Sequence, residues 1–364
     1  MGLACGIVGL PNVGKSTLFS AFTATPADRA IYPFSTTEAN VAVVNVPEER
    51  LETIRRFIAT ERLVPAAMRV VDIPGLAAGA SKGEGMGNKF LGSVKEADAI
   101  LHVVRCFDNP QVVRDGPVEP KGDMEVLELE LAMADLDTVA RNLERVGKKA
   151  RAGEKQSVFE KEVFQRAKEV LEEGRLLRRA EWKPAELAAL RPLFLMTLKP
   201  MLYVANVDQE DLAGTSERAQ AVARHAEEMG SEWIHLCGDL ECELVNMSPE
   251  DRAAFQQELG IAELALPRLI KKSFALLGLQ TFFTAGPKEI RAWTIHRGDT
   301  GPVAAGVIHT DFEKGYIRAE VYSVDDLVAL GSEHAIKAHG KMRVEGRDYV
   351  MRDSDVAHFL VATK

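Results

Sequence analysis

The stretch Gly9-Leu10-Pro11-Asn12-Val13-Gly14-Lys15-Ser16-Thr17 decides the fold, because it has the pattern GxxxxGK[ST] between an apolar run and a helix-forming run. Residues 3–10 predict a short buried strand and residues 15–24 the helix that follows. In such a loop, backbone N–H groups surround the phosphates, and Lys15 supplies a charge to the β and γ phosphates. The sequence therefore predicts a P-loop that binds a nucleoside triphosphate through Asn12, Val13, Gly14, Lys15, Ser16 and Thr17.

A second phosphate-side motif, Asp72-Ile73-Pro74-Gly75, follows a predicted strand over residues 69–73. Alone this motif is a common turn, but after a P-loop it indicates the other half of the site. We expect Asp72 to hold Mg²⁺ through water and the Gly75 N–H to approach the γ phosphate.

The polar loop between these motifs contains Pro33-Phe34-Ser35-Thr36-Thr37. A threonine there can close on Mg²⁺ when the γ phosphate is present, which is how a switch loop senses its nucleotide. Position favours Thr36, with Thr37 as the alternative. The predicted Mg²⁺ ligands are Ser16, Thr36 and Asp72, and the predicted catalytic groups are Lys15, Thr36 and Gly75.

Three further apolar runs predict buried strands over residues 97–104, 200–205 and 231–236. Because helical stretches separate the runs, we expect a mainly parallel sheet covered on both faces. Ligands of such sheets lie at the carboxyl ends of the strands, so this edge should hold the site.

A coiled-coil seam is predicted between the strand over residues 97–104 and the strand over residues 200–205. Its apolar positions alternate in steps of three and four, first at Leu129, Ala132, Leu136, Val139, Leu143 and Val146, and then at Val163, Ala167, Val170, Gly174 and Leu177. The two helices predict an antiparallel hairpin inserted into the sheet domain. Its tip, residues 141–155, has six basic and two acidic side chains, 6 − 2 = +4. This charge fits either a solvated helix surface or a contact with RNA phosphate.

The carboxy-terminal part predicts a separate small α+β domain without a catalytic constellation. Residues 289–295 and 316–322 predict strands, residues 324–330 a helix, and residues 341–351 a hairpin around Glu345-Gly346. The expected division is a nucleotide-binding domain over 1–123 and 190–277, a helical insertion over 124–189, and a last domain over 278–364.

Composition excludes several classes of protein. The chain has 364 residues and a net charge of −9, which argues against a general nucleic-acid coat. Its four cysteines form no CxxC pair, and no run approaches the length of a membrane span. We expect a cytoplasmic protein without a membrane partner.

The base-reading motif departs from the guanine-specific form. Guanine-specific proteins have Asn-Lys-x-Asp after the fourth strand, whereas this chain has Asn206-Val207-Asp208-Gln209. Asp208 comes one residue too early, and Gln209 occupies the carboxylate position. Loss of a charged hydrogen bond costs about 1.5–3 kcal/mol, so strict GTP preference should vanish. An amide suits adenine and tolerates guanine, so ATP is favoured over GTP, with contacts from Asn206, Val207 and Gln209.

Together with the segment from Gly79 to Asn88 and the layout of the whole chain, these motifs resemble the YchF or Obg-like ATPase family. The resemblance implies a Ras-like P-loop NTPase domain, an inserted coiled-coil hairpin and a carboxy-terminal TGS domain of β-grasp fold. It also implies a Mg²⁺-dependent ATPase switch that associates with the large ribosomal subunit, through the basic hairpin tip or the TGS domain, and works as a monomer. The family pattern has Glu where this chain has Gln209.

Three positions bear on the mechanism. Leu76 stands where Ras-like enzymes have a glutamine that orients water, and Arg114 stands in the region where family members often have a histidine. Asn12 occupies the position that helps to bind K⁺ in potassium-dependent relatives, so K⁺ is a second expected ion. Because Leu76 and Arg114 leave the water without an evident orienting group, a nucleotide-sensing adaptor remains an alternative to the ATPase. Because the Gln209 amide also tolerates guanine, a dual ATP/GTP hydrolase is a second alternative.

Overall fold

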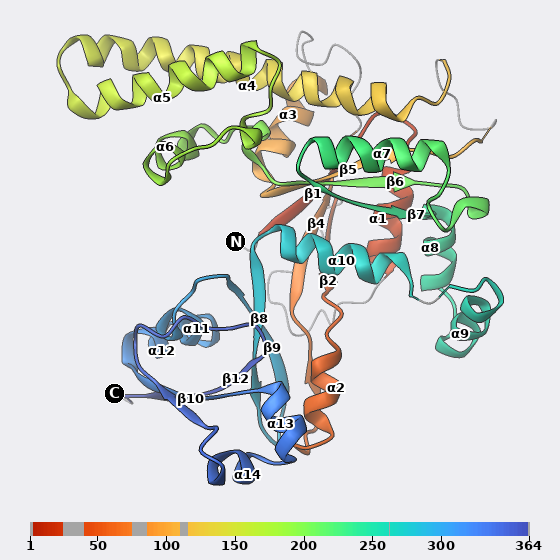
Figure 1. Ribbon diagram of the computed structural model, residues 1–364, viewed down its shortest axis with the longest axis vertical. Helices are drawn as coiled ribbons and strands as arrows, with labels where there is room; N and C mark the ends of the chain where they lie inside the picture. The colour runs from red at the N-terminus through yellow and green to blue at the C-terminus, as the bar shows by residue number, and fades with distance from the viewer. Residues whose placement is uncertain (1–2, 25–39, 75–85, 110–115, 262, 363–364) are drawn as a thin grey trace. The chain divides into compact units, whose positions relative to one another are not determined.

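The computed structural model describes residues 3–24, 40–74, 86–109, 116–261 and 263–362, without the side chains of residues 86–89 and Pro249 (Figure 1). The chain divides into two compact units. The first comprises Met1–Thr25, Arg29–Ala42 and Arg69–Leu269, and the second Pro26–Asp28, Val43–Met68 and Ile270–Lys364.

A six-stranded sheet with the strand order β2-β4-β1-β5-β6-β7 forms the centre of the first unit. The five strands from β4 to β7 in this order are parallel, since β4 pairs in parallel with β1, β1 with β5, β5 with β6, and β6 with β7. The strands are β1 (Ala4–Val8), β2 (Val41–Asn45), β4 (Ala67–Asp72), β5 (Ala99–Arg105), β6 (Met201–Asn206) and β7 (Glu232–Leu236). β1, β5 and β6 are buried along their whole length, as in sheets covered on both faces. The predicted parallel α/β sheet is confirmed.

One hydrophobic core joins β1, β5 and β6 to several helices. These include α3 (Met86–Glu96), α4 (Pro120–Arg151) and α7 (Glu217–Glu228). The helix after the P-loop, α1 (Lys15–Ala24), packs against β1 and α8 (Gly238–Val245). The remaining elements after β6 are η4 (Gln209–Asp211), α9 (Pro249–Glu258) and α10 (Ala265–Leu276).

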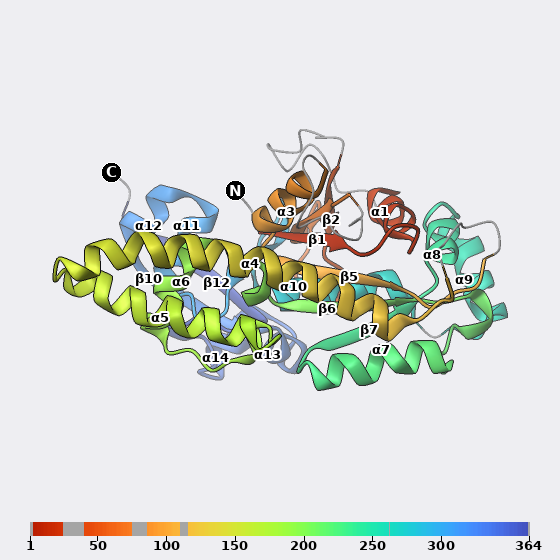
Figure 2. The same ribbon diagram turned by 90° about the horizontal axis from the view of Figure 1, so that it is seen from above.

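The long helix α4 forms an antiparallel hairpin with α5 (Lys155–Glu172), which projects from the sheet in both views (Figures 1 and 2). The hairpin has its own core, which includes Val139, Val146, Val163 and Ala167. The prediction was wrong at Leu129, whose side chain is 58% exposed. The first half of α4 buries a different face against the sheet, so Leu129 points away from that core. Four short helices lead back to β6: η1 (Leu177–Arg179), α6 (Pro184–Leu190), η2 (Arg191–Leu193) and η3 (Met196–Leu198).

The second unit has a mixed sheet with the strand order β11-β10-β12-β8-β9-β3. Its strands are β3 (Leu63–Val64), β8 (Leu279–Ala285), β9 (Ile290–His296), β10 (Tyr316–Ser323), β11 (Arg343–Glu345) and β12 (Asp355–Val361). Its helices are α2 (Glu49–Arg55), α11 (Gly301–Ile308), α12 (Thr310–Gly315), α13 (Val324–Leu330) and α14 (Glu333–Ala338). The expected hairpin over residues 341–351 is wrong, because β11 pairs with β10 instead.

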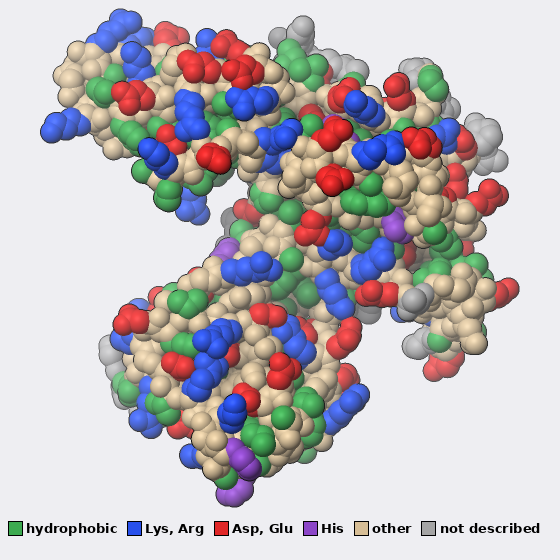
Figure 3. All heavy atoms as spheres, in the orientation of Figure 1, with side chains coloured by type: hydrophobic (Ala, Val, Ile, Leu, Met, Phe, Trp, Pro, Cys, Tyr) green, Lys and Arg blue, Asp and Glu red, His purple; other side chains and the backbone are tan. Residues whose placement is uncertain are grey.

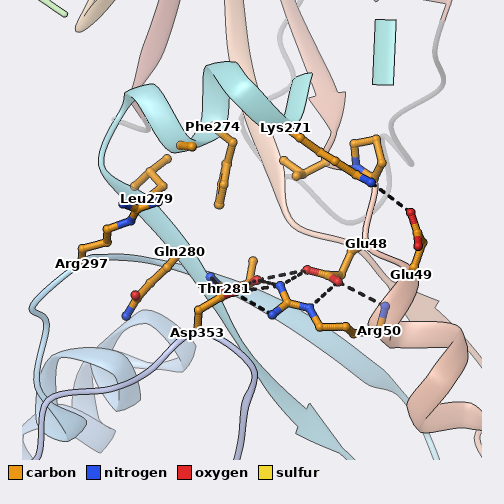
Figure 4. Close-up of a pocket in the computed structure, with 13 residues that line it drawn as sticks. Glu48, Glu49, Arg50, Lys271, Phe274, Leu279, Gln280, Thr281, Arg297 and Asp353 are labelled. Carbon is orange, nitrogen blue, oxygen red and sulfur yellow. Dashed lines mark hydrogen bonds and ion pairs between the residues drawn. The ribbon is translucent and has the colours of Figure 1, made fainter. Parts of the chain in front are cut away.

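Polar contacts fix the segment 43–68 within the second unit, around a pocket of about 470 Å³ (Figure 4). The Arg50 guanidinium donates to Glu48 and Asp353, at 2.5 and 2.8 Å. Glu48 also accepts from the Thr281 hydroxyl at 3.1 Å. These contacts and the parallel pairing of β3 with β9 hold this segment against residues more than 200 positions later.

Candidate functional site

The predicted phosphate and base residues come together in one pocket of about 700 Å³ in the first unit. It lies at the carboxyl ends of β1, β5, β6 and β7, at the expected edge of the sheet. Of the predicted residues, those that line it are Asn12, Gly14, Lys15, Ser16, Thr17, Asn206, Val207 and Gln209. Val13 is buried beneath the loop and contributes its backbone.

The backbone of the P-loop requires particular residues at two positions. Asn12 has a φ of 61° and Gly14 a φ of 96°, in the left-handed region that most side chains avoid. A Cβ at Gly14 would also collide with Nδ2 of Asn206. Gly14 therefore allows the loop to approach the end of β6 closely.

Lys15 and Asp72 form an electrostatic pair on the phosphate side of the site. Burial lowers the pKa of Lys15 to about 8, and the nearby Asp72 opposes this shift. Burial raises the pKa of Asp72, against the opposing effects of Lys15 and of a hydrogen bond from the Ser16 side chain. The Lys15 ammonium donates to the carbonyl oxygen of Leu10 at 2.7 Å. The pair places a desolvated cation beside the loop that is expected to surround phosphate.

The donor set around Asp72 fits Mg²⁺. Among the described residues, Asp72 Oδ1 is buried and has no hydrogen-bond partner. The Ser16 hydroxyl, which is hydrogen-bonded to the same carboxylate, supplies a second oxygen. Carboxylate and hydroxyl oxygens are the ligands that Mg²⁺ prefers, together with phosphate and water. Within the described ranges, no group of three or more His, Cys, Asp or Glu side chains offers an alternative metal site.

Asn206 connects the P-loop to the loop after β7. Its Nδ2 donates to the carbonyl oxygen of Val13, and its Oδ1 accepts from the N–H of Gly238, both at 2.9 Å. Because one partner only accepts and the other only donates, they fix the orientation of the amide. The side chain is buried, so both bonds form away from water. Asn206 thus holds the phosphate side and the base side of the pocket together.

The carboxylate of Asp208 is engaged by the neighbouring loop. Its Oδ2 accepts from the N–H of Asp108 at 3.0 Å, and the Asp108 carboxylate is paired with Arg218 at 2.6 Å. Gln209 is exposed, and both Asp208 and Gln209 line the pocket. The choice of Gln209 over Asp208 for base recognition stays a prediction.

The β5–α4 loop lines the pocket with Phe107, Asp108 and Asn109, which sequence reasoning did not assign. The segment after β7 adds Cys237 and, from the first turn of α8, Asp239. The available signal was positional, since both segments directly follow the carboxyl ends of buried strands.

Five positions singled out in the sequence lie outside the described residues. They are the predicted switch residue Thr36 and its alternative Thr37, the predicted γ-phosphate contact Gly75, and the two mechanistic departures Leu76 and Arg114.

The basic side chains near the free end of the hairpin are exposed (Figure 3). Lys148 pairs with Glu144 at 3.6 Å, and Arg141 donates to the backbone of its own helix. Among the described residues, Arg145, Lys149, Arg151 and Lys155 form no ion pair, so their charges are available to a partner. Across the part of the chain that the structure describes, no helix is long and apolar enough to cross a membrane.

Known proteins resemble this chain over its full length. A family model described as "50S ribosome-binding GTPase" matches residues 4–142, and the YchF-GTPase_C model, described as a protein of unknown function, matches residues 279–362. Two proteins named "Ribosome-binding ATPase YchF" are similar: that of Haemophilus ducreyi is 47% identical over 99% of both chains, and that of Bacillus subtilis is 44% identical over 99% of both. The solved structure of the Schizosaccharomyces pombe YchF GTPase matches with a TM-score of 0.90 and 34% identity, covering 99% of this chain and 98% of that one.

Proposed function

This chain belongs to the YchF family, and from that membership we propose that it is a Mg²⁺-dependent ATPase that associates with the ribosome. The observation that carries the proposal is the single pocket that combines the P-loop with the base-side residues at the end of β6, while Asp72 is hydrogen-bonded to Ser16 of that pocket. Its relatives are named ribosome-binding ATPases, and the pocket contains Lys15 and Ser16, the P-loop groups that an ATPase of this class uses.

The phosphate side supplies charge and positioning. Lys15 would contact the β and γ phosphates, while the N–H groups of residues 12–17 would surround them. Ser16 and Asp72, with Thr36 from the switch loop, would hold Mg²⁺, which when bound neutralises developing phosphate charge. Gly75 would contact the γ phosphate through its N–H. Loss of the γ phosphate would release Thr36 and Gly75, which makes the protein a regulatory switch.

The base side favours adenine without excluding guanine. Asp208 is engaged by the Asp108 N–H, so Gln209 provides the side chain for base recognition beside Asn206 and Val207. An amide can donate to adenine N1 and accept from its N6 amine, and its dual character also supports a second candidate function, a dual ATP/GTP hydrolase.

We expect Gln209→Asp to move the preference toward GTP by roughly tenfold or more, because a carboxylate accepts from guanine N1 and N2 but opposes adenine N1. Titrations of ATP and GTP on parent and variant measure the ratio. Gln257→Asp, an exposed change of the same charge in α9, is the control and should leave the ratio unchanged. An unchanged ratio in Gln209→Asp would mean that Gln209 does not face the base.

A potassium response is expected if the Asn12 amide binds K⁺ against the phosphates. Hydrolysis should then rise when K⁺ replaces Na⁺ at equal ionic strength. Asn12→Gly removes the amide but keeps the left-handed backbone accessible, and it should abolish the response. Equal rates in the two salts for the parent protein would exclude K⁺ as a cofactor.

The ribosomal partner is proposed to be the large subunit, with ribosomal RNA bound by the hairpin tip or by the carboxy-terminal domain. The unpaired cations Arg145, Lys149, Arg151 and Lys155 support a phosphate contact at the tip.

We propose that the protein acts as a cytoplasmic monomer. We further propose the division into a nucleotide domain (1–123 and 190–277), a helical insertion (124–189) and a TGS-type domain (278–364).

Steady-state turnover with and without ribosomes tests the function. A regulatory ATPase should hydrolyse ATP, and ribosomes should change its rate. Tight ATP binding with no turnover in either condition would instead support a nucleotide-sensing adaptor.

A further inference from the structure

Arg105 is a buried cation at the end of β5 beside the nucleotide pocket, and its side chain does not line that pocket. The residue is only 3% exposed. Burying a guanidinium costs free energy unless hydrogen bonds and charges compensate for the lost hydration. The groups that Arg105 contacts therefore indicate why this residue is buried.

Two of these contacts are to the backbone of the loop that follows. Arg105 Nε donates to the carbonyl oxygen of Phe107, and Nη2 donates to that of Asn109, both at 3.2 Å. The guanidinium also lies over the Phe107 ring, with its carbon 4.5 Å from the ring centre. A planar fork that holds two carbonyls and covers a ring is specific to arginine, because lysine has one rotating point charge.

The segment that Arg105 holds forms a wall of the pocket. Phe107, Asp108 and Asn109 all line it, next to Asn206–Glu210 of the base side. The same segment is bonded to β6 and the residues after it, through Cys106 N–H to Asn206 O at 2.8 Å and Asp108 N–H to Asp208 Oδ2 at 3.0 Å. The wall is therefore held by the hydrogen bonds from Arg105 and by the hydrogen bonds to Asn206 and Asp208 of the base-reading segment.

We propose that Arg105 is a positioning residue for the nucleoside part of the ligand: it fixes the wall of Phe107, Asp108 and Asn109 against which the base and ribose bind. The inference rests on the proposed function, because it assumes that a nucleoside triphosphate occupies this pocket. The proposal assigns the two parts of the ligand to different residues. Lys15 and the P-loop bind the triphosphate, whereas Arg105 affects only the binding of the nucleoside, by holding the wall in place.

Arg105→Lys tests this separation, because it keeps the charge and loses the planar fork. Two probes are titrated with Mg²⁺: ATP, and inorganic triphosphate, which lacks the nucleoside. We expect the Kd for ATP to rise roughly tenfold, the scale of one aromatic stacking contact, and the Kd for triphosphate to change less than twofold. At saturating ATP, kcat should be unchanged and KM raised.

Arg178→Lys is the matched control. Arg178 is a second arginine of the first unit with a largely buried side chain, 9% exposed, and it donates to the Tyr203 hydroxyl outside the nucleotide pocket. Both variants should lower Tm, but Arg178→Lys should leave the affinities for both probes unchanged. If Arg105→Lys does not fold, Phe107→Leu replaces it and must weaken ATP binding selectively.

Three results with the variants would overturn the inference: unchanged ATP affinity in folded Arg105→Lys, equal loss of ATP and triphosphate binding in that variant, or the same selective loss in Arg178→Lys. A parent protein that binds triphosphate and ATP equally well would also overturn it. A parent that binds neither probe would overturn the proposed function itself, and the inference with it.

Discussion

Lys15→Ala should weaken ATP binding by roughly hundredfold or more, because it removes the cation that contacts the β and γ phosphates. The fold should persist. Burial is the main cause of the lowered Lys15 pKa, so the ligand-free protein bears a desolvation cost that alanine removes. We therefore expect Tm without nucleotide to stay equal or rise, while the rise in Tm caused by ATP disappears.

Ser16→Ala should share the loss of ATP binding in the presence of Mg²⁺, since it removes a proposed metal ligand beside Asp72. Lys121→Ala is the control for charge: this lysine is exposed and, among the residues that the structure describes, pairs only with Glu125 along α4. It should bind ATP as the parent does. Normal ATP affinity in both Lys15→Ala and Ser16→Ala, with normal melting, would contradict the assignment of the site.

The pH dependence of ATP binding provides a second measure of Lys15. Bound phosphate favours the charged ammonium, so binding raises a pKa that is about 8 in the free protein. Above pH 8 the protein must then take up a proton on binding, and affinity should fall with rising pH, by up to about tenfold per pH unit. Titrations between pH 7 and pH 10 measure this slope. An affinity independent of pH over this range would mean that Lys15 does not contact the phosphates.

Local motifs explain why much of the first unit could be predicted. The P-loop and the strands before Lys15 and Asp72 are each specified within about ten consecutive residues. Predictions failed where a short pattern competed with distant partners. Glu345-Gly346 has the composition of a hairpin turn, yet β11 pairs with β10, some 25 residues earlier. Leu129 continues the heptad spacing, but there α4 packs against the sheet through Leu127 and Leu131.

The contacts that complete the pocket are non-local in the same way. Asn206 was predicted to contact nucleotide, but its bond to Val13 spans 193 residues and has no sequence signal. Arg105 and Phe107 are two residues apart in the chain, yet the position of the pocket wall that contains Phe107 depends on β6 lying alongside β5. Likewise, residues 43–68 belong to the second unit only through partners such as Asp353 and Ile290.

Asn206→Ala should both destabilise the first unit and greatly weaken nucleotide binding. The change leaves the Val13 carbonyl and the Gly238 N–H without their buried partner, at a cost of about 1–3 kcal/mol each. It also frees the P-loop from the base loop, so the two halves of the pocket lose their fixed spacing. We expect a lower Tm and a loss of ATP affinity of roughly tenfold or more, measured by thermal melting and titration.

Asn206→Asp separates the two bonds. A carboxylate still accepts from Gly238 N–H but cannot donate to the Val13 carbonyl, and it sets two acceptors against each other. If Asn206 acts by bracing the P-loop, the affinity for inorganic triphosphate should fall in this variant along with that for ATP. Asn142→Ala is the matched control, because within the described part of the chain its amide donates only to the Thr138 carbonyl oxygen of the same helix, α4. A variant Asn206→Asp that binds triphosphate normally would show that the brace is dispensable, and that Asn206 acts only at the base.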